Sequence, residues 1–98
     1  MTSFYIMRLD PNFDWKTYAW IKRGSRRIKV LQYMANTKTP ITATLLKKTQ
    51  GIDITQAAFT LSELWKKNLV KCLNSGDHHG KLFILSSKSK KIVNKITL

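Results

Sequence analysis

Four side chains at helical spacing carry groups that can recognise the edges of nucleic-acid bases. They lie in a stretch from 55 to 63 that contains no Lys or Arg, and they are Thr55, Gln56, Phe59 and Ser62. Gln can form two hydrogen bonds with adenine, Thr and Ser can bond most bases, and Phe can contact the thymine methyl group. The alternatives are a face that is merely solvated, or a Phe59 that packs on a neighbouring helix or a dimer partner.

Positive charge surrounds this stretch. The chain of 98 residues has 18 Lys and Arg against 5 Asp and Glu, a net charge of +13. Such a charge favours a polyanionic partner, of which nucleic acid is the commonest and an anionic membrane the second. Phosphate contacts position a protein and base contacts specify the sequence. The predicted phosphate contacts are Arg26, Arg27, Lys47, Lys48 and Lys66. Glu63 would repel phosphate, and we expect it to pair with a nearby lysine or, as the alternative, to accept from a cytosine N4.

Residues that could ligate a metal or catalyse a reaction are few. The segment "GDHHG" contains Asp77, His78 and His79, and Cys72 lies nearby, but adjacent side chains rarely point at one ion. We expect no metal and no cofactor, and we expect His78, His79 and Lys81 to meet a minor groove or phosphate. The sequence has neither a glycine loop for phosphate nor "HExxH", which argues against an enzyme.

Prolines, glycines and capping residues divide the chain into elements. The first predicted helix spans 10–24, with Asp10 as N-cap and Pro11 as its first residue. Ser25 is expected to cap a second helix that reaches 36. Thr39 is expected to cap a third helix, which opens on Pro40 and stops at Gly51. A fourth helix is predicted from Ile54 to about Lys67, with Asp53 as its cap and Asn68 in the left-handed conformation.

Beyond Asn68 the apolar period changes from 3.6 to 2. The segments 69–73 and 81–85 are predicted to be two strands of a hairpin, and a last helix follows a cap at Ser86 or Ser87. The fold class is therefore mainly α with a β-hairpin, in the order helix, helix, helix, helix, strand, strand, helix. On the fourth helix, the residues predicted to face the core are Ile54, Ala57, Ala58, Leu61, Leu64 and Trp65.

Three helices followed by a β-hairpin form the winged helix-turn-helix order. "SRRIKVLQYM" and "LSELWKKNLV" resemble the opening helix and the approach to the wing in small archaeal or bacterial ArsR-like and MarR-like regulators, and the resemblance covers about 20–96. It implies a transcriptional regulator that binds double-stranded DNA and places residues 54–67 in the major groove. Asn68 stands where these families usually have glycine, and Phe59 where they often have arginine. The family's base contacts therefore cannot be copied onto this chain.

We expect one domain over 1–98, with 1–24 and 86–98 as the dimerisation elements. Aromatic residues spread around the first helix and would leave exposed apolar surface unless a homodimer partner covers them; they are Phe13, Trp15, Tyr18 and Trp20. In the competing hypothesis, residues 1–7 fold back over them. The longest uncharged stretch has nine residues, too short to span a membrane, and we expect a cytoplasmic, nucleoid-associated protein. The alternative functions are a protein-interaction module and a sequence-neutral architectural DNA binder.

Overall fold

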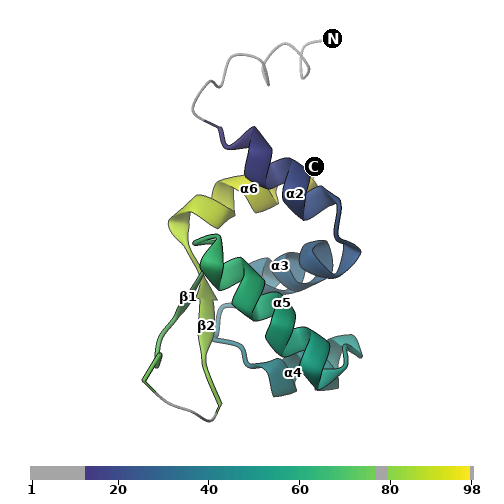
Figure 1. Ribbon diagram of the computed structural model, residues 1–98, viewed down its shortest axis with the longest axis vertical. Coiled ribbons are helices and arrows are strands. Elements are labelled where there is room, and N and C mark those ends of the chain that lie inside the picture. Colours follow the sequence, from purple (N-terminus) through teal and green to yellow (C-terminus); the bar gives the residue numbers. More distant parts are fainter. Residues whose placement is uncertain (1–12, 77–79, 98) are drawn as a thin grey trace.

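The computed structural model describes residues 13–76 and 80–97, which form five helices and one β-hairpin (Figure 1). The predicted order of elements and the predicted fold class are confirmed. In chain order the elements are α2 (Trp15–Lys22), α3 (Ser25–Asn36), α4 (Ala43–Gln50), α5 (Ile54–Lys66), β1 (Val70–Cys72), β2 (Phe83–Leu85) and α6 (Ser87–Thr97).

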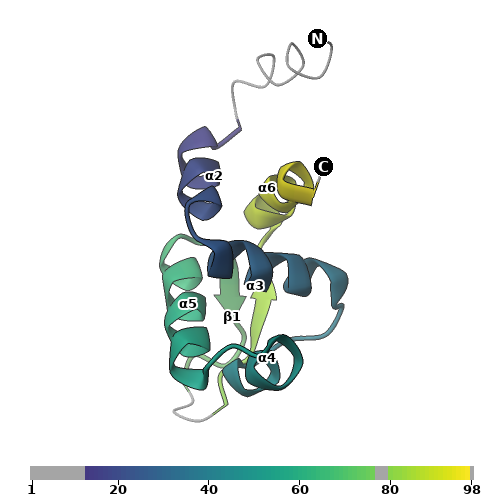
Figure 2. The same ribbon diagram turned by 90° about the vertical axis from the view of Figure 1, so that its right-hand side faces the viewer.

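Helix α3 is the centre of the domain. It contacts α2, α5, β2 and α6, and its inward side chains Val30 and Leu31 are fully buried. Two views at right angles show α2 and α6 together at one end of the molecule and α4 at the other (Figures 1 and 2). Leu64 of α5 and Ile92 of α6 complete the core around α3. The chain thus separates a helical pair at one end from the α4–α5 motif and hairpin at the other.

The β-hairpin carries a short third pairing. Strands β1 and β2 are antiparallel, with Val70 opposite Leu85 and Cys72 opposite Phe83. On its other edge Phe83 pairs with Ile41, whose N–H donates to the Phe83 carbonyl at 3.0 Å and whose carbonyl accepts from Phe83 N at 2.9 Å. This bridge ties the segment before α4 to the hairpin.

The same bridge corrects the predicted start of the third helix. Thr39 does not cap it and Pro40 does not open it. The backbone at Ile41 is extended because it pairs with Phe83, and α4 begins at Ala43. Thr42 is the cap, and its hydroxyl accepts from the N–H of Leu45 at 3.1 Å. Local capping rules favour Thr39, which precedes Pro40, but the pairing of Ile41 with Phe83 moves the N-cap of the helix to Thr42.

The starts of α2 and α3 also differ from prediction. Asp10 and Pro11 lie outside the described residues, and the N-cap of α2 is Asp14. The N-cap of α3 is Gly24, so Ser25 is the first residue of the helix rather than its cap. At the other end of the chain, Ser86 caps α6, because its Oγ accepts from Ser89 N at 3.3 Å.

The predicted boundaries of α5 are confirmed within one residue. Asp53 caps the helix through a hydrogen bond from Thr55 N to its Oδ2 at 3.1 Å. Gly51 ends α4 with φ of 67°, and Asn68 follows α5 with φ of 63°. Both values lie in the left-handed region, which Gly adopts freely and Asn tolerates. These three local signals fix where the two helices of the motif meet and where the hairpin begins.

The buried face of α5 is rotated from the predicted one. Ala57, Leu61 and Leu64 are buried as expected, but Ile54 is 42% exposed and Ala58 is exposed as well. Thr60 is buried in their place, and its hydroxyl donates to the Gln56 carbonyl at 2.8 Å. That bond satisfies the hydroxyl inside the helix, so a threonine can occupy the core side.

Asp14 ties α2 to α6. Its Oδ2 accepts from the Thr17 hydroxyl at 2.6 Å, its Oδ1 accepts from Thr17 N at 3.0 Å, and Lys88 Nζ lies 3.1 Å away. The Thr17 hydroxyl, then the Thr17 N–H, and then Lys88 lower the pKa of Asp14 to about 2. Because the folded pKa is depressed, the ionised carboxylate stabilises the fold above the ordinary aspartate pKa, and this contribution is lost as the pH falls toward 2.

We therefore expect Asp14→Asn to lower the free energy of unfolding by about 0.5–1 kcal/mol at pH 7. The value is small because solvent screens a side chain that is 34% exposed. The difference from wild type should shrink below pH 4 and vanish near pH 2. Urea unfolding at pH 7, 4 and 2.5 measures it, and a difference that persists unchanged to pH 2.5 would contradict the role of the charge.

Candidate nucleic-acid interface

The outer face of α5 carries the side chains that the sequence predicts as base contacts. Thr55, Gln56 and Phe59 are exposed there, and 60% of Phe59 is accessible to solvent. Phe59 therefore does not pack on a neighbouring helix in the described part of the chain. Ser62 is partly buried at the edge of this face, where it lines a groove.

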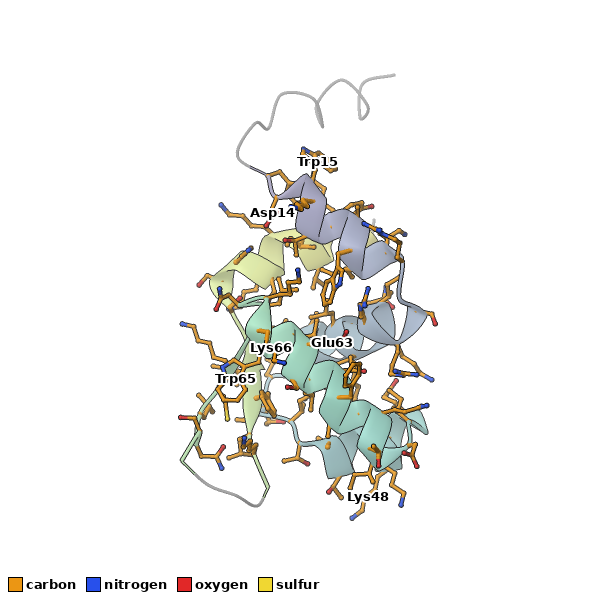
Figure 3. The ribbon with its side chains drawn as sticks, viewed as in Figure 1. Asp14, Trp15, Lys48, Glu63, Trp65 and Lys66 are labelled. Carbon is orange, nitrogen blue, oxygen red and sulfur yellow. The ribbon has the colours of Figure 1, made fainter. Side chains whose placement is uncertain are left out.

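This groove, of about 370 Å³, lies between α5, the start of α4 and β2. Ile54, Ala58 and Trp65 form its α5 wall, which explains why the predicted inward arc is not wholly in the core. Figure 3 shows Trp65 on the hairpin side of α5. Lys81, a predicted wing contact, lies at the same groove with its Nζ 5.3 Å from the centre of the Trp65 ring. The groove therefore lies between the predicted base-contact face of α5 and the hairpin.

The lysines predicted to contact phosphate are exposed. Lys47 and Lys48 lie in the last turn of α4, where positive charge also complements the negative end of the helix dipole. Lys48 lies at the end of the molecule opposite Asp14 and Trp15 (Figure 3). Lys66 is in the last turn of α5. These exposed side chains thus lie on the two helices α4 and α5.

The two predicted arginines have different surroundings. Arg26 is half-buried at the start of α3. Arg27 pairs with Glu63 of α5 at 3.4 Å and donates to the Trp20 carbonyl at 2.6 Å. The expected partner of Glu63 was a lysine, and the structure corrects it to Arg27. Sequence reasoning missed the pair because 36 residues separate the two side chains, and helix periodicity relates only residues three or four apart.

The wing is held at its base by a residue that sequence reasoning did not select. Asn74 Oδ1 accepts from Leu82 N at 2.7 Å, and its Nδ2 donates to the Gly80 carbonyl at 3.2 Å. An Asn beside turn glycines is a known local signal for such backbone bonding. The predicted wing contacts His78 and His79 lie outside the described residues.

The aromatic residues predicted to form a dimer interface have several roles within the chain. Phe13 is 8% exposed and belongs to the core, and its ring meets Trp15 and Tyr18 edge-on at 4.4 and 5.8 Å. Trp20 lies under the guanidinium of Arg27, which is 3.9 Å from its ring centre. Trp15 and Tyr18 remain partly accessible at the α2–α6 end. The competing contact by residues 1–7 lies outside the described residues.

The described residues contain neither a candidate metal site nor a helix that could cross a membrane. No group of three or more His, Cys, Asp or Glu side chains in 13–76 and 80–97 could hold a metal ion. Within the same ranges, each helix is either too short or too polar to cross a membrane.

No protein-family model matches the chain, and no curated protein matches it. Solved structures do. The repressor MarR from Listeria monocytogenes shares 20% identity at a TM-score of 0.70, over 99% of this chain and 65% of that protein. A MarR mutant from E. coli complexed with operator DNA shares 23% identity at a TM-score of 0.63, over 95% of this chain and 69% of that protein. A MepR mutant from S. aureus bound to an oligodeoxyribonucleotide shares 17% identity at a TM-score of 0.67, over 99% of this chain and 74% of that protein.

These likenesses show that the chain has the winged helix-turn-helix fold of the MarR and MepR repressors. In this fold α4 and α5 are the helix-turn-helix and the β1–β2 hairpin is the wing. The chain spans about two thirds of the length of the Listeria repressor.

Proposed function

We propose that this protein is a transcriptional regulator that binds double-stranded DNA with a preference for sequence. The observation that carries the proposal is the outer face of α5, where Thr55, Gln56 and Phe59 are exposed on the second helix of a helix-turn-helix. The N-terminal half of that helix meets base edges in such motifs. Among proteins with the same fold, one has been crystallised with operator DNA and another with an oligodeoxyribonucleotide, which supports this partner.

The proposal assigns the phosphate contacts to the basic residues beside this face. Lys47 and Lys48 reach from the end of α4, Lys66 from α5, and Lys81 from the base of the wing. His78 and His79 remain proposed contacts of the wing tip. The net charge of +13 supplies the sequence-independent part of the affinity, and it steepens the salt dependence by about 0.9 in log–log slope for each phosphate neutralised.

We further propose a homodimer through the end formed by α2 and α6. This end lies opposite α4 (Figures 1 and 2), so a two-fold partner there would leave both α5 helices accessible. Trp15 and Tyr18 are the partly accessible aromatic residues that such a partner would cover. Two-fold symmetry then predicts inverted half-sites whose centres lie about one helical turn, or about 10 base pairs, apart. We also propose that the protein acts on the DNA of the nucleoid.

Selection of bound sequences from random duplex DNA tests the proposal. The expected result is one enriched motif with inverted half-sites, and retention that falls steeply between about 50 and 200 mM salt. An enriched motif without two-fold symmetry would contradict the proposed dimer but not the proposed preference for a DNA sequence. Salt-sensitive binding without any enriched motif would instead indicate an architectural DNA binder.

One observation favours a second candidate, a protein-interaction module. Phe59 is a large aromatic side chain that is 60% exposed, and aromatic anchors of this kind are common at protein interfaces. The selection separates the two candidates. A protein-interaction module would show no salt-sensitive retention on duplex DNA, whereas a DNA-binding regulator would.

A further inference from the structure

The surroundings of Arg27 do not resemble those of a side chain held ready for phosphate. Its Nη1 donates to the Trp20 carbonyl at 2.6 Å, its Nη2 lies 3.4 Å from Glu63 Oε2, and its guanidinium covers the Trp20 ring. The side chain is only 22% exposed, and that of Glu63 is 25% exposed. Arg27, which belongs to α3, therefore contacts both the end of α2 and the C-terminal half of α5.

Local rules alone do not favour an arginine at this position. Arg27 lies in the first turn of α3, which contains no acidic residue, and the positive end of the helix dipole disfavours a cation there. The compensating groups come from other elements. Glu63 supplies an opposite charge, and the Trp20 carbonyl lies in the last turn of α2, where helix carbonyls need external donors. Tertiary contacts thus explain the residue where helix propensity does not.

Gly24 gives a second, independent observation. Its φ is −123°, which any residue can adopt, so its backbone does not require glycine. A Cβ atom at Gly24, however, would lie 2.8 Å from Cδ and 3.0 Å from Nε of Arg27. Both distances are below the 3.4–4 Å of ordinary van der Waals contact, so the Arg27 side chain would have to shift, although its guanidinium is already held by Trp20 and Glu63. The absence of a side chain at Gly24 makes room for Arg27 to lie back over α2.

Glu63, the residue of α5 that Arg27 contacts, lies beside the proposed base contacts. Glu63 is four residues after Phe59, so the two side chains are neighbours on one side of the helix. A bond at Glu63 therefore restrains rotation of α5 about its own axis. Lys67, the C-cap of α5, adds a contact of the same kind, with its Nζ 5.1 Å from the centre of the Trp20 ring. Trp20 consequently meets a cation from α3 and a cation from the end of α5.

We propose that Arg27 is a positioning residue, which together with Trp20 and Glu63 sets the orientation of α5 for base recognition and does not neutralise a phosphate. We call these three residues the Arg27 clamp. The part of the inference that concerns DNA rests on the proposed function. The clamp itself is a property of the protein without DNA and can be tested separately.

The first test uses the free protein. We expect Arg27→Gln and Gly24→Ala to speed amide hydrogen exchange in residues 59–66 of α5 relative to α4. The first variant removes the guanidinium that contacts Glu63, and the second displaces it. Arg26→Gln is the matched control, since it removes the same charge from the neighbouring residue and should leave exchange in α5 unchanged. Unchanged exchange in both Arg27→Gln and Gly24→Ala would overturn the clamp, whatever the protein binds.

The second test measures affinity for the selected duplex and for random duplex over a range of salt concentrations. Arg27→Gln and Gly24→Ala should each lower the preference for the selected duplex about tenfold and leave the salt slope unchanged. Gly24→Ala is the sharper variant, because it keeps every charge of the protein. If Arg27 instead contacts phosphate, Arg27→Gln should reduce the salt slope by about 0.9 and weaken both duplexes alike.

Different results would contradict the proposed function and the positioning role of Arg27. Wild-type protein without any preferred duplex would overturn the proposed function, and the exchange data would still decide whether the clamp exists. A wild type that prefers one duplex, with variants that lose only salt slope, would overturn the positioning role of Arg27 and leave the proposed function intact.

Discussion

Leu64→Ala should lower the free energy of unfolding by about 2–5 kcal/mol, which is a large effect for a single truncation. Leu64 is 0% exposed and lies in the core on the inner face of α5. Removing three of its carbons loses transfer free energy and leaves a cavity that the surrounding helices cannot fully close. Since small domains are stable by only about 5–15 kcal/mol, this loss is a substantial fraction of the total stability.

Urea unfolding followed by tryptophan fluorescence measures this effect. Leu73→Ala is the matched control, because Leu73 has the same side chain but is 53% exposed. We expect the control to stay within about 0.5 kcal/mol of wild type. Equal losses in the two variants would show that burial in the structure does not govern stability at these positions.

The second large effect concerns recognition. Phe59→Ala should weaken binding to the preferred duplex by roughly 1–3 kcal/mol, while affinity for random duplex and the salt slope stay unchanged. The reason is that Phe59 has no charge to release counterions, so it can contribute only through apolar contact. Its ring is exposed on the outer face of α5, where a thymine methyl group is the apolar feature of the major groove.

Replacement of thymine by deoxyuracil in the preferred duplex isolates this contact, because only the methyl group is lost. The wild type should bind the substituted duplex less tightly at one or more positions, and Phe59→Ala should not distinguish the two duplexes. Lys48→Ala serves as the comparison. It should weaken all duplexes and reduce the salt slope by about 0.9. A Phe59→Ala variant that binds preferred DNA as tightly as wild type would instead favour Phe59 as a protein contact.

The elements that could be predicted from sequence are those whose signals are local. Asp53, Gly51 and Asn68 each act on backbone groups within a few residues, and the structure places all three as expected. The change of apolar period after Asn68 likewise predicted the hairpin, because period 2 and period 3.6 place side chains on different faces. For the candidate site, the exposure of Thr55, Gln56 and Phe59 followed from helix geometry alone.

The features that sequence could not supply depend on residues far apart in the chain. Capping preference accepts Thr39 or Thr42 equally, and only the pairing of Ile41 with Phe83 made Thr42 the start of α4. Periodicity assigned Ile54 and Ala58 to the core, but the neighbouring hairpin and α4 turned them toward a groove.

The sequence by itself therefore determined that this is a basic winged-helix protein with an uncharged stretch on its second motif helix. Backbone capping and apolar periodicity are encoded over a few residues and survive in any fold. The tertiary structure decided which arginine meets Glu63 and why Gly24 has no side chain, because both answers require α2, α3 and α5 to be in place. Long-range pairs of this kind leave no periodic trace in a single chain, and only packing brings them together.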